Sequence, residues 1–181
     1  MHTLTKDGLA GFEIRFYDWS GHHPINDMIK ARGQGVNHVT VALVYNDGTS
    51  MEFVVDMEGA TVKPSALLER AYGEPLFKYF FSVPVFKSYQ INGTQVSERI
   101  VFNKWDMLFP AYVKMVNDHK TSPVWYHLLW WYTGRILPEP TNCLSLTKQF
   151  LHAYDFRSKF TATDILGLLK QVHHYHKKET S

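Results

Sequence analysis

The chain has few of the features that would assign it to a specialised class of protein. Only one of its 181 residues, Cys143, is a cysteine, so no disulfide can form within the chain. A single cysteine is consistent with a reducing compartment. The longest apolar run, residues 124–132, is far shorter than the ~20 residues that a membrane-spanning helix needs. The sequence therefore excludes an internal disulfide scaffold and predicts no transmembrane segment.

Charge of one sign is scarce as well. The net charge is only +2 with the histidines neutral, and no stretch collects five or six basic residues, so we expect no nucleic-acid partner. The first residues lack the charged and then apolar layout of a signal peptide. Without repeats or linkers, residues 1–181 are expected to form one domain. We expect a stand-alone cytoplasmic protein, which would suit a phage or bacterial source.

The residues that are present predict an α+β fold, an antiparallel sheet packed against helices that lie mostly in the second half of the chain. Strands are predicted where β-branched and aromatic residues gather or alternate with polar ones, and helices where the apolar spacing is helical. The predicted strands are 12–17, 38–45, 51–55, 76–85 and 87–91, with 95–102 continuing the sheet. The predicted helices are 26–32, 65–71, 106–119, 124–132, 141–154 and 163–174.

The clearest local signal is a hairpin between strands 38–45 and 51–55. The loop Asn46-Asp47-Gly48 suits a three-residue turn that ends on a glycine in the left-handed conformation. Such a loop pairs Tyr45 with Thr49 and, further along the strands, His38 with Asp56. Facing residues share one side of the sheet, with their Cβ atoms roughly 5 Å apart. The hairpin therefore predicts that His38 and Asp56 are neighbours.

Cys143 lies where a cysteine can be reactive. Pro138 and Pro140 favour an extended approach, and Thr141 or Asn142 can cap a helix that begins at the cysteine. In the first turn of a helix, the unpaired N–H groups and the helix dipole favour a thiolate. The same N–H groups can stabilise the oxyanion that forms during acyl transfer. The competing interpretation is that Cys143 is an inert thiol of the core.

A reactive thiolate needs a proton carrier, and histidine is the usual one. Among ten histidines we favour His38, because it opens the strongest predicted strand and is held rigidly there. Asp56 is the predicted third member, which would orient the imidazole. Glu52, which lies on the same side but further along, and Glu58, which fits if the register moves by two, remain alternatives. A structural role for His38 and a plain strand-end role for Asp56 compete with these assignments.

Two blocks of sequence resemble a known family. The first is a strand that opens with His38 (Asn37-His38-Val39-Thr40-Val41), followed by Val54-Val55-Asp56, Gly59 and Pro64. The second is the helix start Asn142-Cys143-Leu144-Ser145-Leu146. Together they are similar to circularly permuted NlpC/P60 proteins, a branch of the papain-like superfamily in which the histidine precedes the cysteine. The resemblance implies a permuted papain-like fold with Cys143 as nucleophile, His38 as base and Asp56 as the residue that orients it.

Members of that family cleave amide or ester bonds, and some transfer acyl groups to or from lipids. The resemblance therefore implies a cysteine hydrolase that acts on a peptide, amide or acyl ester through a thioester. Tyr126 or Tyr132 is a candidate oxyanion donor. Neither a cofactor nor a metal ion is expected. An acyltransferase that uses lipid, or a binding protein with the same fold and an inert cysteine, would also fit the sequence.

Overall fold

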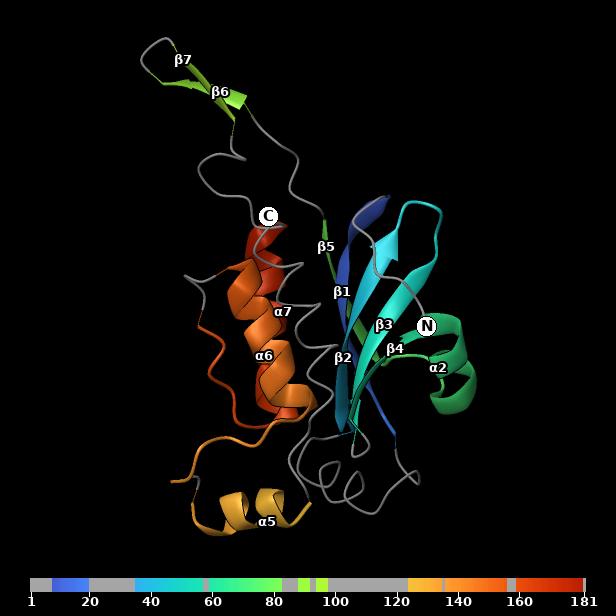
Figure 1. Cartoon of the computed structure of the whole chain (residues 1–181), viewed down its shortest axis with the longest axis vertical. Helices are drawn as coiled ribbons and strands as arrows, with labels where there is room; N and C mark the ends of the chain where they lie inside the picture. Colours follow the sequence, from blue (N-terminus) through green and yellow to red (C-terminus); the bar gives the residue numbers. More distant parts are fainter. Residues whose placement is uncertain are drawn as a thin grey trace.

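The computed structural model describes residues 8–19, 35–56, 59–82, 88–91, 94–97, 124–134, 136–155 and 159–180. Within them the predicted α+β class is confirmed, with a five-stranded antiparallel sheet and four helices (Figure 1). The sheet has the order β4-β3-β2-β1-β5. Its strands are β1 (Leu9–Tyr17), β2 (His38–Tyr45), β3 (Ser50–Asp56), β4 (Gly59–Pro64) and β5 (Phe77–Ser82). The helices are α2 (Ser65–Tyr72), α5 (Val124–Tyr132), α6 (Cys143–Tyr154) and α7 (Ile165–Glu179).

The β2–β3 hairpin has the predicted loop and register. The Tyr45 N–H donates to the carbonyl of Thr49 at 2.9 Å, and Ala42 lies opposite Glu52. Gly48 has a φ of 86°, the left-handed conformation that the loop requires and that glycine adopts without strain. The alternating residues of both strands therefore point to the sides of the sheet that the sequence indicates.

The structure corrects the prediction in two places. Residues 59–64, which lie in no predicted strand or helix, form strand β4 beside β3. The strands β6 (Ser88–Ile91) and β7 (Thr94–Ser97) form a separate two-stranded sheet and do not continue the main one. The predicted helices 26–32 and 106–119 lie outside the described residues. No helix among the described residues is long and apolar enough to cross a membrane.

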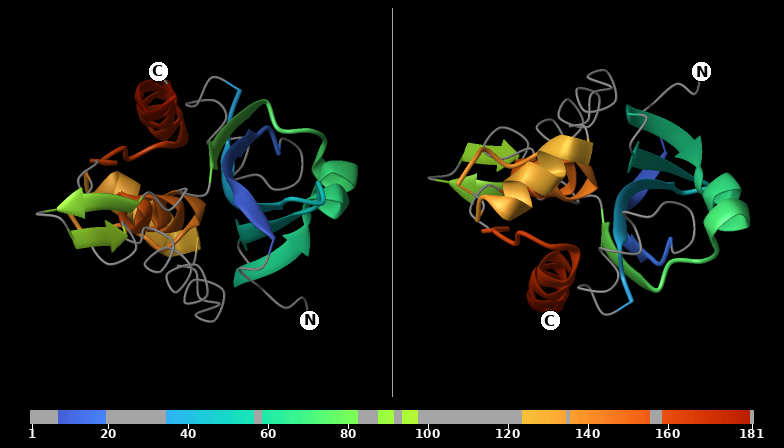
Figure 2. Two further views of the ribbon diagram at one scale, coloured as in Figure 1. Left: turned by 90° about the horizontal axis from the view of Figure 1, so that it is seen from above. Right: turned by 90° about the horizontal axis from the view of Figure 1, so that it is seen from below.

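The main sheet has helices on both faces, as the end-on views in Figure 2 show. Helix α6 packs against β2 and β3, and α7 packs against β5. Between these two helices and the sheet lies the main core, which is apolar and rich in aromatic residues. The rings of Phe12 and Phe150 meet edge to face there, with centroids 5.1 Å apart. We call this side of the sheet the apolar face.

Helix α2 lies on the opposite side, against β3 and β4. This side, which we call the polar face, has a smaller buried apolar cluster at the end of the sheet where β2 begins. The cluster contains Tyr17, Trp19, Val54 and Leu68, with Tyr72 packed against it. Because side chains alternate along a strand, each strand of the sheet contributes residues to both faces.

Candidate functional site

Cys143 is the first residue of α6, as the sequence predicts. The side chain of Asn142 accepts a hydrogen bond from the Ser145 N–H at 3.0 Å, and the Ser145 hydroxyl accepts one from the Asn142 N–H at 2.9 Å. These reciprocal bonds are a capping box, which fixes the start of a helix. The prediction that Thr141 or Asn142 caps the helix is thus confirmed for Asn142. The thiol is held in the first turn of α6.

The environment of the thiol differs from the predicted one. Cys143 is half-buried and packs against the core on the apolar face. Burial raises the pKa of its thiol to about 11, although the backbone N–H groups of Val39, Leu144 and Cys143 itself oppose the shift. The expected lowering of the thiol pKa is therefore wrong for this conformation. Loss of solvation outweighs the helix N-terminus, so the thiol is protonated at neutral pH.

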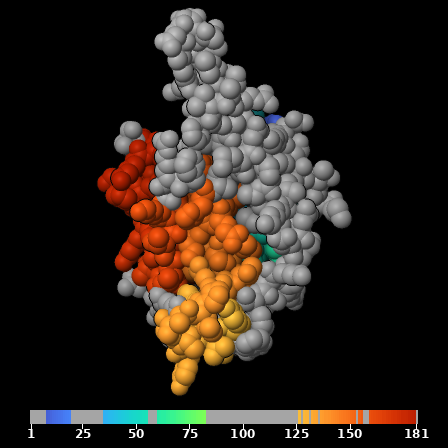
Figure 3. Space-filling view, turned by 60° about the vertical axis from the view of Figure 1, so that its left-hand side comes forward, coloured from blue at the N-terminus to red at the C-terminus, as the bar shows by residue number. Residues whose placement is uncertain are grey.

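Val39 is the residue directly after His38, so one of the N–H groups that lower the pKa of the thiol comes from the start of β2, against which α6 packs. Figure 3 shows α5, α6 and α7 next to one another on one face of the molecule, with α5 at its lower end. Two segments that are far apart in the sequence, the start of β2 and the start of α6, therefore meet at one end of the sheet.

The His38 side chain is buried on the polar face. Its ring stacks on the ring of Trp19, with centroids 3.5 Å apart and planes 14° apart, and Trp19 in turn stacks on Tyr72 at 4.1 Å. Burial lowers the pKa of His38 to about 3, so the imidazole is neutral at neutral pH. Its Nε2 atom has no hydrogen-bond partner in the part of the chain that the structure describes. A buried polar atom in that state costs about 1–3 kcal/mol.

The two predicted partners thus lie on opposite faces of the sheet. Val39 belongs to the main core that Cys143 packs against, and His38, its neighbour on β2, points to the other side. In the described conformation α6 packs against β2, but the His38 imidazole is on the side of β2 away from the thiol. In this conformation the two side chains are therefore not in contact, and the alternation of side chains along β2 is the physical reason.

The third predicted member is only partly placed. Asp56 ends β3 and pairs with Gly59 of β4, and its side chain lies outside what the structure describes, as does Glu58. The β2–β3 ladder extends from Val41, opposite Phe53, to the hairpin loop. It therefore ends before His38, and the pairing of His38 with Asp56 remains a prediction.

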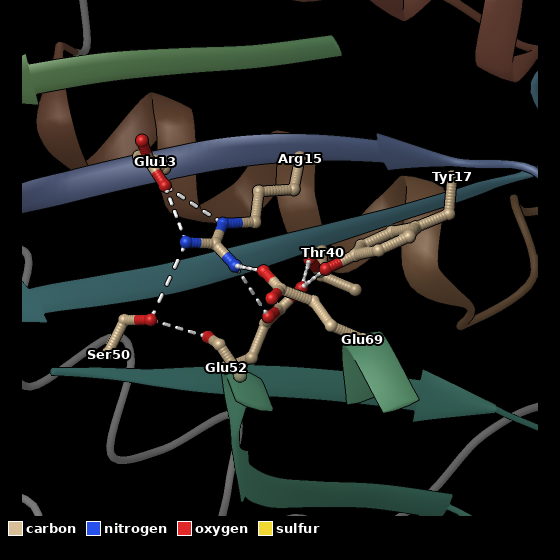
Figure 4. A network of polar contacts seen from close by, with 8 residues as sticks. Glu13, Arg15, Tyr17, Thr40, Ser50, Glu52 and Glu69 are labelled. Atoms are coloured by element: carbon tan, nitrogen blue, oxygen red, sulfur yellow. Dashed lines mark hydrogen bonds and ion pairs between the residues drawn. The ribbon is translucent and has the colours of Figure 1, made fainter. Parts of the chain in front are cut away.

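Glu52, one of the alternative acids, is at the centre of a buried polar network on the polar face (Figure 4). One carboxylate oxygen accepts hydrogen bonds from the hydroxyls of Tyr17 and Thr40, each at 2.5 Å. The other accepts one from the Arg15 guanidinium at 3.1 Å. Both oxygens of this fully buried carboxylate are satisfied, so Glu52 is committed to the network and does not orient His38.

Three carboxylates surround the single guanidinium of Arg15. Glu13 accepts two hydrogen bonds from it, at 2.7 and 2.9 Å, and Glu69 of α2 accepts one at 3.4 Å. Burial by itself lowers the pKa of Arg15, but the charges of Glu52 and Glu13 outweigh that effect and the net shift is upward. Burial, followed by the charge of Glu52, raises the pKa of Tyr17. The network therefore contains a permanently protonated cation and a neutral tyrosine.

The sequence indicates Glu52 as an alternative acid but does not predict the network around it. The signal was present in the alternation of β1, where Glu13, Arg15 and Tyr17 all point to the side opposite the apolar residues. Such a pattern is typical of a face open to water, whereas α2 covers this one. No group of three or more His, Cys, Asp or Glu side chains in the described ranges is arranged to bind a metal ion.

Of the two tyrosines named as oxyanion donors, only Tyr126 has a contact with the chain that leads into Cys143 among the described residues. The hydroxyl of Tyr126 donates to the carbonyl of Pro138 at 2.7 Å, so its proton is already used. Tyr132 is almost fully exposed. In this conformation the backbone N–H groups near the thiol are better placed donors than either hydroxyl.

A scan of protein-family models and searches of the curated proteins and of the solved structures found no match to the chain.

Proposed function

We propose that this protein is a cysteine hydrolase of permuted papain-like arrangement, with Cys143 as nucleophile and His38 as base. The observation that carries the proposal is the position of the thiol. It lies in the capped first turn of α6, a helix that packs against β2, and the backbone N–H of Val39, one residue from His38, lowers the pKa of the thiol. A nucleophile at a helix start, beside the strand that supplies the base, is the arrangement that thiol-based acyl transfer needs.

The chemistry that follows is the cleavage of an amide or ester bond. His38 takes the proton of the Cys143 thiol, and the thiolate attacks the carbonyl carbon of the substrate to form a carbon–sulfur bond. The bond to the amine or alcohol breaks as that leaving group takes the proton from the imidazolium. Water then hydrolyses the thioester and restores the thiol. The N–H groups of Val39 and of the first turn of α6 are the available donors to the oxyanion.

This reaction requires the His38 ring to leave Trp19 and move to the side of β2 on which the thiol lies. Two observations favour such a movement. His38 lies at the first position of β2, where it pairs with Tyr17 of β1 but lies beyond the end of the β2–β3 ladder, so it is paired on one side only, whereas Val41 is paired on both. Its Nε2 atom also lacks a partner among the described residues, so leaving the stack breaks no hydrogen bond of that atom.

The test is the rate at which the single thiol is alkylated, measured by intact mass from pH 5 to 10. We expect the parent to show a minor labelling phase below the ordinary thiol pKa of about 8.5, from the conformation in which His38 reaches the thiol, beside the high-pH curve of the buried thiol. The variant His38→Ala should lose this phase. His152→Ala is the matched control, because His152 lies on α6 itself but points away to the carbonyl of Phe160. It should leave the profile unchanged.

A second candidate function is a binding or accessory protein in which Cys143 is inert. The raised pKa of the thiol and the position of His38 on the polar face both favour it. It predicts slow labelling that follows one curve with a high apparent pKa, identical in the parent and in His38→Ala. That result would overturn the proposed hydrolase.

A further inference from the structure

The chain that leads into Cys143, residues 137–142, is held from two sides; we call it the approach segment. From α5, the indole N–H of Trp130 donates to the carbonyl of Leu137 at 3.0 Å, and the hydroxyl of Tyr126 donates to the carbonyl of Pro138. From α6, the ammonium of Lys148 binds the carboxylate of Glu139. Three consecutive residues are thus fixed by side chains of two helices, a short distance before the thiol.

Lys148 is the central member of this arrangement. Its ammonium donates to both oxygens of Glu139, at 2.6 and 2.7 Å, and to the carbonyl of Ala162 at 2.9 Å. An ammonium has three N–H donors, so its whole hydrogen-bonding capacity is used. The residue is buried. A buried lysine is costly unless it is fully paired, so this geometry is tightly specified.

The partners of Lys148 come from different parts of the fold. Glu139 belongs to the approach segment, and Ala162 lies just before α7. The N–H of Ala162 also donates a hydrogen bond to the side chain of Gln171 on α7, at 3.0 Å. Side chains on a helix lean toward its N-terminus, so the ammonium of Lys148 reaches back toward the end of α6 that carries Cys143. One side chain therefore joins the approach segment, α6 and the segment before α7.

We propose that Lys148 is a positioning residue for Cys143, which holds the approach segment against α6 and thereby fixes the place and the burial of the thiol. The inference rests on the proposed function in that Cys143 is the reacting group of that function. It adds a residue that is not among the predicted site residues Cys143, His38 and Asp56. Breaking the Glu139–Lys148 pair should loosen the chain directly before the cap and admit water to the thiol.

The experiment is the pH profile of alkylation in Lys148→Met and Glu139→Gln, measured by intact mass without substrate. Since burial is the main cause of the raised thiol pKa, exposure should move the profile toward lower pH. Each unit of decrease raises the thiolate fraction tenfold below the pKa, so we expect labelling at pH 8 to rise at least about tenfold. Lys148→Arg can keep a bidentate pair with Glu139 and should stay within about threefold of the parent.

The control must lower stability without touching the approach segment. Tyr175→Phe does so, since it removes the hydrogen bond from the Tyr175 hydroxyl to Asp155 at the other end of α6. It should lower the melting temperature and leave the labelling profile unchanged. Unchanged profiles in Lys148→Met and Glu139→Gln, with lower melting temperatures, would overturn the proposal. If Lys148→Met does not fold, Glu139→Gln decides the question, because it retains the size of the side chain.

The two proposals fail separately. The hydrolase fails if His38→Ala leaves the labelling profile of the parent unchanged. The positioning role of Lys148 fails if Lys148→Met and Glu139→Gln leave that profile unchanged, whatever the result for His38→Ala.

Discussion

The two faces of the sheet are stabilised in different ways. The apolar face is closed by α6 and α7 over a core in which aromatic rings meet edge to face, as Phe12 and Phe150 do. The polar face is closed by α2 over a buried guanidinium and a buried carboxylate, those of Arg15 and Glu52. The same strands supply both faces, so the difference comes from the alternating side chains alone.

This difference indicates which face tolerates change. A packed apolar core depends on volume, and its energy varies little with pH or salt. A buried ionic network depends on each partner, because the removal of one partner leaves an unpaired charge or hydrogen-bonding group in the interior. We therefore expect substitutions on the apolar face to act through cavities, and substitutions on the polar face to act through uncompensated charge.

The largest effect should follow from Phe150→Ala, which leaves a cavity beneath α6 where the ring now contacts Phe12. Such truncations cost about 3–5 kcal/mol. The measurement is urea unfolding at low and high salt, at pH 6 and pH 8, and the loss should be the same under all conditions. Phe150→Leu, which retains most of the volume, should cost clearly less. A loss that changes strongly with salt would contradict a purely apolar core on this face.

A slightly smaller loss, about 3 kcal/mol, is expected for Glu52→Gln, which removes the charge opposite Arg15. The amide oxygen can still accept from Tyr17 and Thr40, so the value should lie at the low end for a broken buried pair. Glu69→Gln is the matched control, since Glu69 pairs with the same guanidinium but is partly exposed. It should cost less than about 1 kcal/mol. Equal losses for the two variants would show that water reaches the whole network.

The hairpin shows how far the sequence leads when local chemistry decides a structure. The three-residue loop from Asn46 to Gly48 favours one turn geometry, and that geometry sets the register of two strands. The start of α6 is similar, because a capping residue must precede it and Asn142 is suited to that role. Both features depend on neighbours in the sequence, and the structure confirms both.

Features that depend on the choice of a face could not be predicted as well. Val39, Val41 and Leu43 form an apolar side of β2, so alternation placed His38 on the other side from the start. The sequence did not indicate on which face of the sheet α6 would pack. The face that carries His38 is partly apolar as well, because Ala42 of β2 lies on it. The distance between Cys143 and His38 in the sequence contains no information on this choice.

The polar network was hidden for a related reason. The charges of β1 were visible in the sequence, but their burial depends on α2, a helix that lies far along the chain from Arg15 and packs over β3 and β4. Sequence alternation indicates which side chains share a face. It does not indicate whether a helix covers that face, because coverage depends on the connection geometry of β4 and α2.

The stability of the polar face should depend on pH through His38. Burial lowers the pKa of this imidazole to about 3, below its ordinary value of 6.5. Below pH 6.5 the unfolded chain binds a proton that the folded protein does not, so stability is present above pH 6.5 and is lost as the pH falls toward 3. The contribution amounts to a loss of about 2 kcal/mol at pH 5.

The variant His38→Gln should remove this contribution, so its stability should fall less than that of the parent between pH 8 and pH 5. Urea unfolding at several pH values measures the free energy of unfolding of the variant and of the parent. Their difference at each pH removes the effect of the other titrating groups, which the two proteins share. His174→Gln, an exposed position on α7, should keep the slope of the parent. Parallel curves for His38→Gln and the parent would mean that the folded protein takes up a proton at His38. The imidazole would then be exposed to water and not buried against Trp19.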